Sequence, residues 1–274
     1  MSKQNNKLKI FLIGYKSFLQ QNLYEYLKKK YLVKKIRFEN FKKYKIRDND
    51  TIINFSYNKN FFSKKYNITN DRNYYLAKLL KNTKSNFILI STRQIYKPKI
   101  NVTENSVIKP INNYAKNCLY SEKICKKVLG NNLLILRLAN VIGFEIGKKK
   151  KPSLMSSIIT GIKKKKIIFD NNFYIYKDLL PVELFCVLLE KLIKSNQKGT
   201  LNLGSGIPIK IDFFLSKIIE KKDIQIEVKI KKNFKDNNFS FKTEKLNKII
   251  NSKITKKDLF IYFKRLKKEL KKIR

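Results

Sequence analysis

The chain has 274 residues, of which 43% are hydrophobic, and its 15 Tyr and 19 Phe exclude an intrinsically disordered protein. Lys and Arg number 63 against 20 Asp and Glu, which gives a formal net charge of +43. The sequence has no histidine, which excludes His-based triads and His metal sites, and its three cysteines form neither a disulfide framework nor a CxxC motif.

Short apolar runs alternate along the chain with amphipathic stretches. The run 8–13 predicts a buried strand that ends at Gly14, and the leucines at 19, 23 and 27 recur with the spacing of one helix face. Further strands are predicted at 31–38, 51–55, 87–91 and 133–138, and further helices around 74–80 and 113–129. Because parallel strands need crossover helices, this alternation predicts an α/β fold with a doubly wound parallel sheet of the Rossmann type.

The second half of the chain is less regular. Lysine runs at 148–151 and 163–166 mark the edge of the first lobe, and residues 224–230 alternate as a half-buried strand does. Thr255 and Asp258 form a capping box ahead of an amphipathic terminal helix. We expect a dinucleotide-binding domain and a smaller α/β substrate lobe. The domain comprises residues 1–145 plus about 175–205, and the lobe comprises residues 146–174 and 206–274.

The turn after the first strand lies where a Rossmann fold binds the phosphates of a dinucleotide. Gly14 can form the tight turn, and the helix N-terminus that follows can face an anion. Ser17 and Gln20, however, occupy the positions of the other two glycines. Taken alone, this motif is explained equally well by a plain strand-to-helix turn.

Two segments carry a more specific pattern. Residues 88–96 read Ile-Leu-Ile-Ser-Thr-Arg-Gln-Ile-Tyr, and Tyr114 stands at the start of a later predicted helix. Further matching motifs are residues 51–56, Asn67, Asn73, and residues 136–143, 177–182 and 199–206. In their order over about residues 8–250, these motifs resemble the extended short-chain dehydrogenases, the NAD-dependent epimerase/dehydratase family that acts on nucleotide sugars.

The resemblance implies hydride transfer at C4 of a nucleotide sugar, as in polysaccharide biosynthesis, with NAD or NADP as the cofactor. The matching catalytic residues are Tyr114, as proton donor or acceptor, and Thr92, as its hydrogen-bond partner. The implied cofactor-binding residues are Gly14, Ser17, Phe18, Leu19, Arg37, Phe55 and Ser56. The implied substrate-binding residues are Asn140 and Lys177, of which Lys177 would meet a diphosphate.

Beyond the glycine turn, the chain departs from the family pattern at three further positions. Cys118 replaces the lysine that lowers the pKa of the catalytic tyrosine, and Arg93 and Gln94 replace the acid and base of the 4,6-dehydratases. The missing carboxylates disfavour elimination of water, so epimerase and 4-keto reductase remain. The missing lysine leaves open an impaired enzyme or a non-catalytic nucleotide-binding module.

The choice between NAD and NADP stays open at the sequence level. At the end of the second strand of a Rossmann fold, an acid binds the ribose 2′-hydroxyl, whereas an arginine accepts a 2′-phosphate. This chain offers both Arg37 and Glu39 there.

The excess charge is spread from end to end, which favours a solvated lysine-rich surface over a nucleic-acid interface. Nucleic-acid binding therefore ranks as a second alternative. No apolar run approaches the roughly 18 residues of a membrane span. We expect a cytoplasmic protein with a nucleotide-sugar substrate, no membrane partner and no metal, and we leave a homodimer open.

Overall fold

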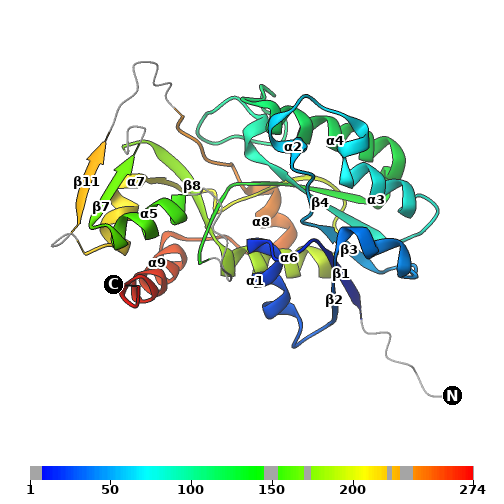
Figure 1. Ribbon diagram of the computed structural model, residues 1–274, viewed down its shortest axis with the longest axis horizontal. Helices are drawn as coiled ribbons and strands as arrows, with labels where there is room; N and C mark the ends of the chain where they lie inside the picture. Colours follow the sequence, from blue (N-terminus) through cyan, green and yellow to red (C-terminus); the bar gives the residue numbers. More distant parts are fainter. Residues whose placement is uncertain (1–7, 145–153, 170–173, 221–223, 229–236, 274) are drawn as a thin grey trace. The chain divides into compact units, whose positions relative to one another are not determined.

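The computed structural model describes residues 8–144, 154–169, 174–220, 224–228 and 237–273, which divide into two compact units (Figure 1). Unit 1 comprises Met1–Lys97, Glu104–Leu138 and Cys186–Asn202. Unit 2 comprises Pro98–Thr103, Ala139–Phe185 and Leu203–Arg274. The assignment of a cofactor role to one part and a substrate role to the other stays a prediction.

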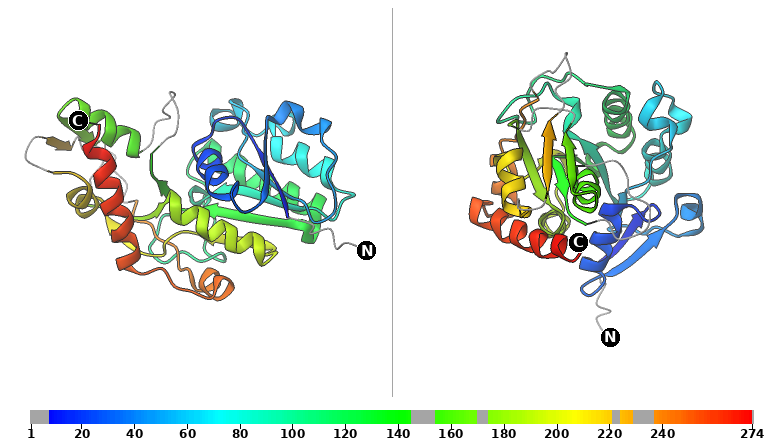
Figure 2. Two further views of the ribbon diagram at one scale, coloured as in Figure 1. Left: turned by 90° about the horizontal axis from the view of Figure 1, so that it is seen from below. Right: turned by 60° about the vertical axis from the view of Figure 1, so that its left-hand side comes forward.

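Unit 1 is built on a six-stranded sheet in the order β2-β1-β3-β4-β5-β9, which Figure 2 shows from two further sides. Neighbouring strands from β2 to β5 pair in parallel. The strands are β1 (Lys9–Ile13), β2 (Leu32–Ile36), β3 (Thr51–Asn54), β4 (Asn86–Thr92), β5 (Leu133–Leu138) and β9 (Gly199–Leu203). The predicted doubly wound parallel sheet is therefore confirmed.

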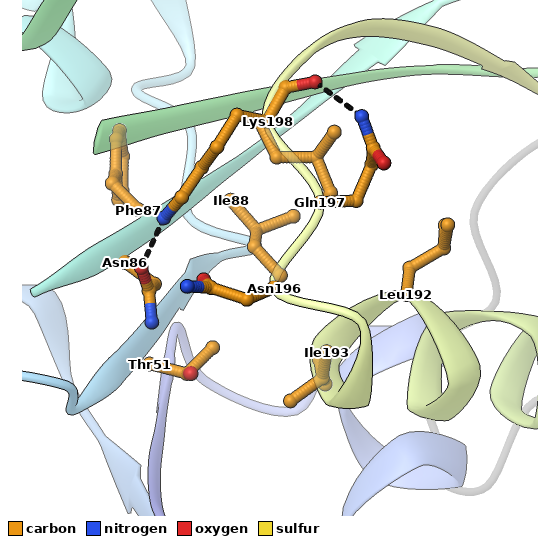
Figure 3. A pocket seen from close by; sticks show the side chains of 10 residues that line it. Thr51, Asn86, Phe87, Ile88, Leu192, Ile193, Asn196, Gln197 and Lys198 are labelled. Atoms are coloured by element: carbon orange, nitrogen blue, oxygen red, sulfur yellow. Dashed lines mark hydrogen bonds between the residues drawn. The ribbon is translucent and has the colours of Figure 1, made fainter. Parts of the chain in front are cut away.

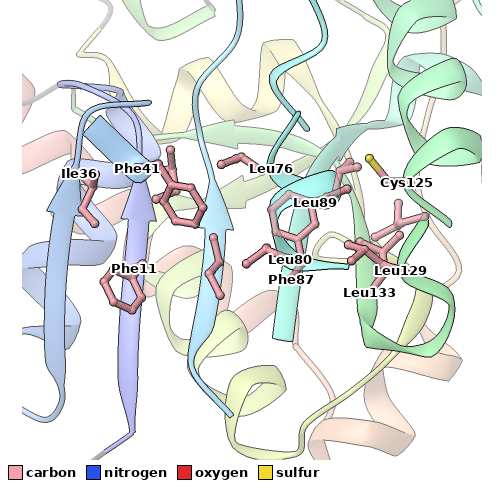
Figure 4. Close-up of a cluster of buried hydrophobic side chains, with 14 residues drawn as sticks. Phe11, Ile36, Phe41, Leu76, Leu80, Phe87, Leu89, Cys125, Leu129 and Leu133 are labelled. Carbon is pink, nitrogen blue, oxygen red and sulfur yellow. The ribbon is translucent and has the colours of Figure 1, made fainter. Parts of the chain in front are cut away.

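Helices cover both faces of this sheet, with α3 and α4 on one side and α1 and α6 on the other (Figure 1). The helices are α1 (Phe18–Leu27), α2 (Asn60–Ser63), α3 (Arg72–Leu80), α4 (Asn113–Leu129) and α6 (Val182–Lys194). On the α3–α4 side, alternate strand residues such as Phe11, Phe87 and Leu133 pack with Leu80 and Cys125 in one buried cluster (Figure 4). Such alternation is what a strand requires to turn one set of side chains to a helix layer.

A buried ion pair ties α4 to the sheet. The guanidinium of Arg137 on β5 contacts the carboxylate of Glu122 on α4 through both Nη2 (2.6 Å) and Nε (3.2 Å), and both side chains are less than 10% exposed. Ser91 on β4 also donates to Glu122, and Arg137 donates to the hydroxyl of Tyr96 at 2.6 Å. Tyr96 in turn donates to Asn202 on β9 at 2.9 Å.

A second charged network joins α1 to α6 within unit 1. The Glu190 carboxylate accepts hydrogen bonds from Tyr26 (2.6 Å), Lys30 (2.9 Å) and Tyr31 (2.8 Å), and it pairs with Lys194. Burial by itself raises the pKa of Glu190, but these donors outweigh burial and lower the pKa to about 2.

Unit 2 contains a three-stranded sheet in the order β10-β8-β6 and a parallel pair, β11 and β7. Its strands are β6 (Asn140–Ile142), β7 (Lys166–Phe169), β8 (Tyr176–Pro181), β10 (Pro208–Lys210) and β11 (Gln225–Val228). Its helices are α5 (Leu154–Lys163), α7 (Ile211–Ile218), α8 (Glu244–Ile250) and α9 (Lys256–Lys271). The predicted capping box of the terminal helix is present at Thr255 and Asp258. The predicted lysine run at 148–151 lies outside the described residues.

Replacing Glu190 with Gln should lower the free energy of unfolding at pH 7 by about 2 kcal/mol, because the charged network between α1 and α6 is lost. The folded-state pKa lies below the unfolded value, so this stabilisation is present above about pH 4.5 and is lost as the pH falls toward 2. Urea unfolding of wild type and Glu190→Gln at pH 7 and at pH 3 measures both effects.

Glu25→Gln is the matched control, because Glu25 forms a solvent-exposed pair with Lys28 on the outside of α1. We expect it to change the stability by less than about 0.5 kcal/mol. Equal unfolding midpoints for wild type and Glu190→Gln at pH 7 would contradict the role of this network.

Candidate active site

The loop from β1 to α1 lies where the strand order of the sheet reverses, because β1 pairs with β2 on one side and β3 on the other. Open parallel sheets bind ligands at such a point. Gly14 follows β1 with a φ of 143°, and its N–H donates to the carbonyl oxygen of Ile36 at 2.8 Å. A Cβ on Gly14 would lie 3.4 Å from the carbonyl carbon of Phe55. That distance is an ordinary contact, so it is the backbone angle that favours glycine here.

Ser17 and Gln20 stand where a Rossmann turn has its other two glycines, and their side chains stabilise the turn by hydrogen bonds. The Ser17 hydroxyl caps α1 by accepting the backbone N–H of Gln20 at 3.2 Å. The buried Gln20 side chain donates through Nε2 to two carbonyl oxygens of β1 and its turn, each at 3.0 Å. Gln20 Oε1 is buried and has no hydrogen-bond partner among the described residues. The turn is thus shaped by side chains as well as by Gly14.

A cavity of about 280 Å³ lies beside this turn. The lining residues are Gly14, Tyr15, Lys16, Gln20, Gln21, Lys35 and Arg37. Three of these side chains are cationic, and none of the seven is acidic. The cavity therefore suits an anionic ligand, and it adjoins the N-terminus of α1, whose first N–H groups belong to Phe18 and Leu19.

Two predicted cofactor residues follow β3 and lie next to the same turn. The N–H of Phe55 donates to the carbonyl oxygen of Ile13 at 2.8 Å. The backbone N–H of Ser56 donates to Asn54 Oδ1 at 2.9 Å, and the Ser56 hydroxyl accepts from the guanidinium of Arg72. The structure thus brings the ends of β1 and β3 together, and the cofactor roles of Phe55 and Ser56 stay predictions.

A short polar chain links the end of β4 to the start of α4. The Thr92 hydroxyl accepts the backbone N–H of Gln94 at 3.2 Å, and the Gln94 side chain accepts a hydrogen bond from Asn112 at 2.8 Å. Asn112 caps α4 by accepting the N–H of Ala115 at 2.8 Å. This linkage fixes the helix that presents Tyr114. The hydrogen bond between Thr92 and Tyr114 stays a prediction.

The Tyr114 ring lies in an aromatic cluster. The ring of Phe62 stacks on it with centroids 5.2 Å apart and planes at 19°, and Tyr57 and Phe61 meet it edge-on at 6.2 and 6.4 Å. Asn117, also on α4, donates to the carbonyl oxygen of Phe61 at 2.9 Å and so fastens α2 to the helix. The sequence segment after β3 therefore forms one wall around Tyr114.

This environment keeps Tyr114 protonated. Burial raises its pKa well above the ordinary value of 10, and the thiol of Cys118 raises the pKa further. Burial also raises the pKa of Cys118, so the thiol is neutral as well. A lysine ammonium at position 118 would act in the opposite direction, since a nearby positive charge favours the phenolate. Tyr114 is therefore a neutral phenol at physiological pH.

Tyr57 is a residue of this cluster that the sequence analysis does not predict. Its hydroxyl donates to the carbonyl oxygen of Ile90 on β4. Burial, and after it the neighbouring Tyr114, raises the pKa of Tyr57 well above 10. Its position directly after Phe55 and Ser56, at the carboxyl end of a parallel strand, is the signal that could have identified it.

The two predicted substrate residues belong to unit 2. Asn140 on β6 donates to the carbonyl oxygen of Asp178 at 3.1 Å, and Lys177 on β8 donates to that of Asn237 at 2.6 Å. Asp178 is fully buried and accepts the backbone N–H groups of Ser205, Gly206 and Phe241. Asp178 is thus structural, and the binding roles of Asn140 and Lys177 stay predictions.

Another cavity in unit 1 is not a candidate site. It lies at the amino ends of β3 and β4, where Thr51 and Asn86 begin these strands, and Lys198 donates to Asn86 across it (Figure 3). Its volume is about 10 Å³, which suits one water molecule. Gly14 and Thr92 stand at the opposite, carboxyl edge of the sheet.

The described residues hold neither a metal-binding cluster nor a membrane-spanning helix. No group of three or more Cys, Asp or Glu side chains there could hold a metal ion. No helix in that part of the chain is long and apolar enough to cross a membrane.

Comparison with known proteins identifies relatives of this fold. The model of the NAD dependent epimerase/dehydratase family matches residues 46–186, and no curated protein matches the chain. A UDP-N-acetylglucosamine 4-epimerase from Methanobrevibacter ruminantium, solved with UDP-N-acetylmuramic acid, superposes with a TM-score of 0.79 at 15% identity, over 98% of this chain and 99% of that one.

A second solved structure, RMD from Pseudomonas aeruginosa complexed with NADPH, gives a TM-score of 0.73 at 16% identity, over 97% of this chain and 99% of that one. A third is the UDP-N-acetylglucosamine 4-epimerase from Bacillus cereus, with a TM-score of 0.73 at 16% identity, over 96% and 99% of the two chains. At these identities the structures support the fold alone.

The environment of Cys118 predicts a thiol that is slow to react. All three cysteines are buried, and burial raises the pKa of Cys118. We expect iodoacetamide at pH 8 to alkylate Cys118 in the native protein at least about 100-fold more slowly than in guanidinium, as mass spectrometry of its peptide can measure. Equal rates in the native and unfolded proteins would show that Cys118 is exposed and would contradict its burial beside Tyr114.

Proposed function

Because the chain belongs to the NAD dependent epimerase/dehydratase family, we propose that it reduces a ketone at C4 of a nucleotide sugar, with Tyr114 as the proton donor. The observation that carries this proposal is the enclosure of Tyr114, whose ring packs against Phe62, Tyr57 and Phe61 and whose pKa is raised by burial. Hydride transfer to a ketone leaves an alkoxide, which takes a proton from an acid. A neutral phenol is such an acid.

The same observation disfavours the opposite direction of the reaction. Oxidation of an alcohol, which begins an epimerisation at C4, needs a base to remove the hydroxyl proton. A phenol with a pKa of 10 is only about 0.1% ionised at pH 7, and each further unit of pKa adds about 1.4 kcal/mol to the free energy of forming the phenolate base. Reduction is therefore favoured over epimerisation.

The residues of the Gly14 turn fit a dinucleotide cofactor, which would supply the hydride. Gly14 adopts the positive φ of the tight turn, and the first N–H groups of α1, those of Phe18 and Leu19, would hold the diphosphate. Phe55 and Ser56 would line the cofactor where β3 ends. Ser17 orders the turn through its cap on α1.

Thr92 and Gln94 support the reductase assignment in different ways. Thr92 accepts one hydrogen bond, and its own O–H can donate to the substrate oxygen or to Tyr114. Gln94 stands where a dehydratase carries a base, and its side chain already accepts a hydrogen bond from Asn112. Its amide cannot remove a proton, so elimination of water has no base there. Asn140 and Lys177 remain the candidates for binding the sugar nucleotide.

A non-catalytic dinucleotide-binding protein is the second candidate. The stacking of Phe62 on Tyr114 favours it, because a packed ring has less freedom to meet a substrate. The presence of Gln20 in place of a glycine in the turn also favours the non-catalytic candidate.

The test is turnover of 4-keto nucleotide sugars, measured by the loss of reduced nicotinamide absorbance. Tyr114→Phe should lower kcat by about 10³-fold, because it removes the acid, while leaving the Kd of the dinucleotide unchanged. Tyr120→Phe is the matched control on the same helix, where the ring is 51% exposed, and it should keep full activity.

Two outcomes would contradict the proposal. A Tyr114→Phe variant with wild-type kcat would exclude Tyr114 as the acid. Tight dinucleotide binding without turnover of any keto sugar would favour the non-catalytic candidate instead.

A further inference from the structure

The cavity beside the Gly14 turn carries more positive charge than a neutral ribose needs. Lys16 comes from the turn itself, Lys35 from β2, and Arg37 from the residue directly after β2. No acidic side chain is among the residues that line it. A ribose with free hydroxyls is well served by a carboxylate, whereas a phosphate ester on that ribose requires cations.

The register of the sheet brings Arg37 next to the turn. β1 and β2 are parallel with Ile13 opposite Ile36, so both strands end at the same level. The N–H of Gly14 donates to the carbonyl oxygen of Ile36 at 2.8 Å. This hydrogen bond directly joins the turn after β1 to the end of β2. Arg37 and Gly14 therefore leave the sheet side by side.

Tyr15 holds the two nearest cations in place. The Arg37 guanidinium lies over the Tyr15 ring at 4.2 Å, and the Lys16 ammonium lies 5.0 Å from the same centroid. Hydrogen bonds from Lys16 and then Arg37 lower the pKa of the Tyr15 hydroxyl. Two flexible cations are thus gathered around one ring, which reduces the entropy that they lose when an anion binds.

Glu39, the acid that could instead bind a 2′-hydroxyl, is engaged elsewhere. It lies in the 3-10 segment Phe38–Lys43 and pairs with the guanidinium of Arg72 at 3.0 Å. Arg72 is itself fixed over the Phe38 ring at 4.5 Å and donates to Ser56. Glu39 is not among the residues that line the cavity. The two residues that the sequence leaves as alternatives are therefore separated by the structure.

We propose that this cavity binds the 2′-phosphate of NADP(H), with Arg37 as the residue that selects it and Lys16 and Lys35 as supporting cations. The proposal rests on the proposed function in one respect, namely that a dinucleotide lies on the Gly14 turn. The phosphate carries close to two negative charges, and Arg37 binds it through paired N–H groups. NADPH should bind at least about 10-fold more tightly than NADH.

The experiment measures the Kd of NADPH and NADH by calorimetry, which needs no turnover. Arg37→Gln should weaken NADPH binding by at least about 10-fold and leave the Kd of NADH within about 2-fold, because only the phosphate contact is lost. Raising the salt concentration should weaken NADPH binding more than NADH binding.

Two variants serve as matched controls. Lys34→Gln removes a cation of the same strand, which lies over the ring of Tyr44 and does not line the cavity. Glu39→Gln removes the alternative acid. Both should keep the wild-type ratio of the two Kd values, and thermal unfolding checks that all three variants are folded.

Three results would overturn the proposal. NADH binding as tightly as NADPH would exclude a 2′-phosphate site and leave the proposed reductase intact. If Arg37→Gln raised the Kd of NADPH and NADH by the same factor, Arg37 would contact a part that the two dinucleotides share and would not be the selecting residue. Failure of the wild-type protein to bind either dinucleotide would exclude this proposal and the proposed function together.

Discussion

The ion pair between Arg137 and Glu122 is the interaction on which the candidate site depends. Taking two charges out of water costs several kcal/mol for each ion, and only close, multiple contacts offset that cost. Here the carboxylate is met by two guanidinium nitrogens and the Ser91 hydroxyl. The pair fixes α4 against β4 and β5, and these elements carry Tyr114 and Thr92. Loss of either partner would cost about 3–5 kcal/mol and release the helix.

The chemistry of the site follows from what surrounds the phenol on that helix. A fixed helix presents Tyr114, the chain after β3 closes around its ring, and burial together with the thiol of Cys118 keeps the phenol neutral. Because Cys118 is a buried thiol and not an ammonium, nothing on that helix face stabilises a phenolate.

The sequence predicts the sheet well because each strand and helix carries its own periodicity, and the Gly14 turn because it follows a strand end. It predicts less of the site, since neighbours in space are not neighbours in the chain. The aromatic wall around Tyr114 depends on a hydrogen bond from Asn117 to a loop far away in sequence. Glu39 is likewise paired with a guanidinium on α3, a contact that no local pattern indicates.

The most direct test of a neutral Tyr114 is the pH dependence of kcat for ketone reduction. An acid works only while it holds its proton, so the rate is constant at low pH and falls above its pKa. The raised pKa of Tyr114 predicts a kcat that stays level up to at least pH 10. A fall in kcat between about pH 6 and 8, absent in Tyr114→Phe, would show a phenol of lowered pKa and contradict this account.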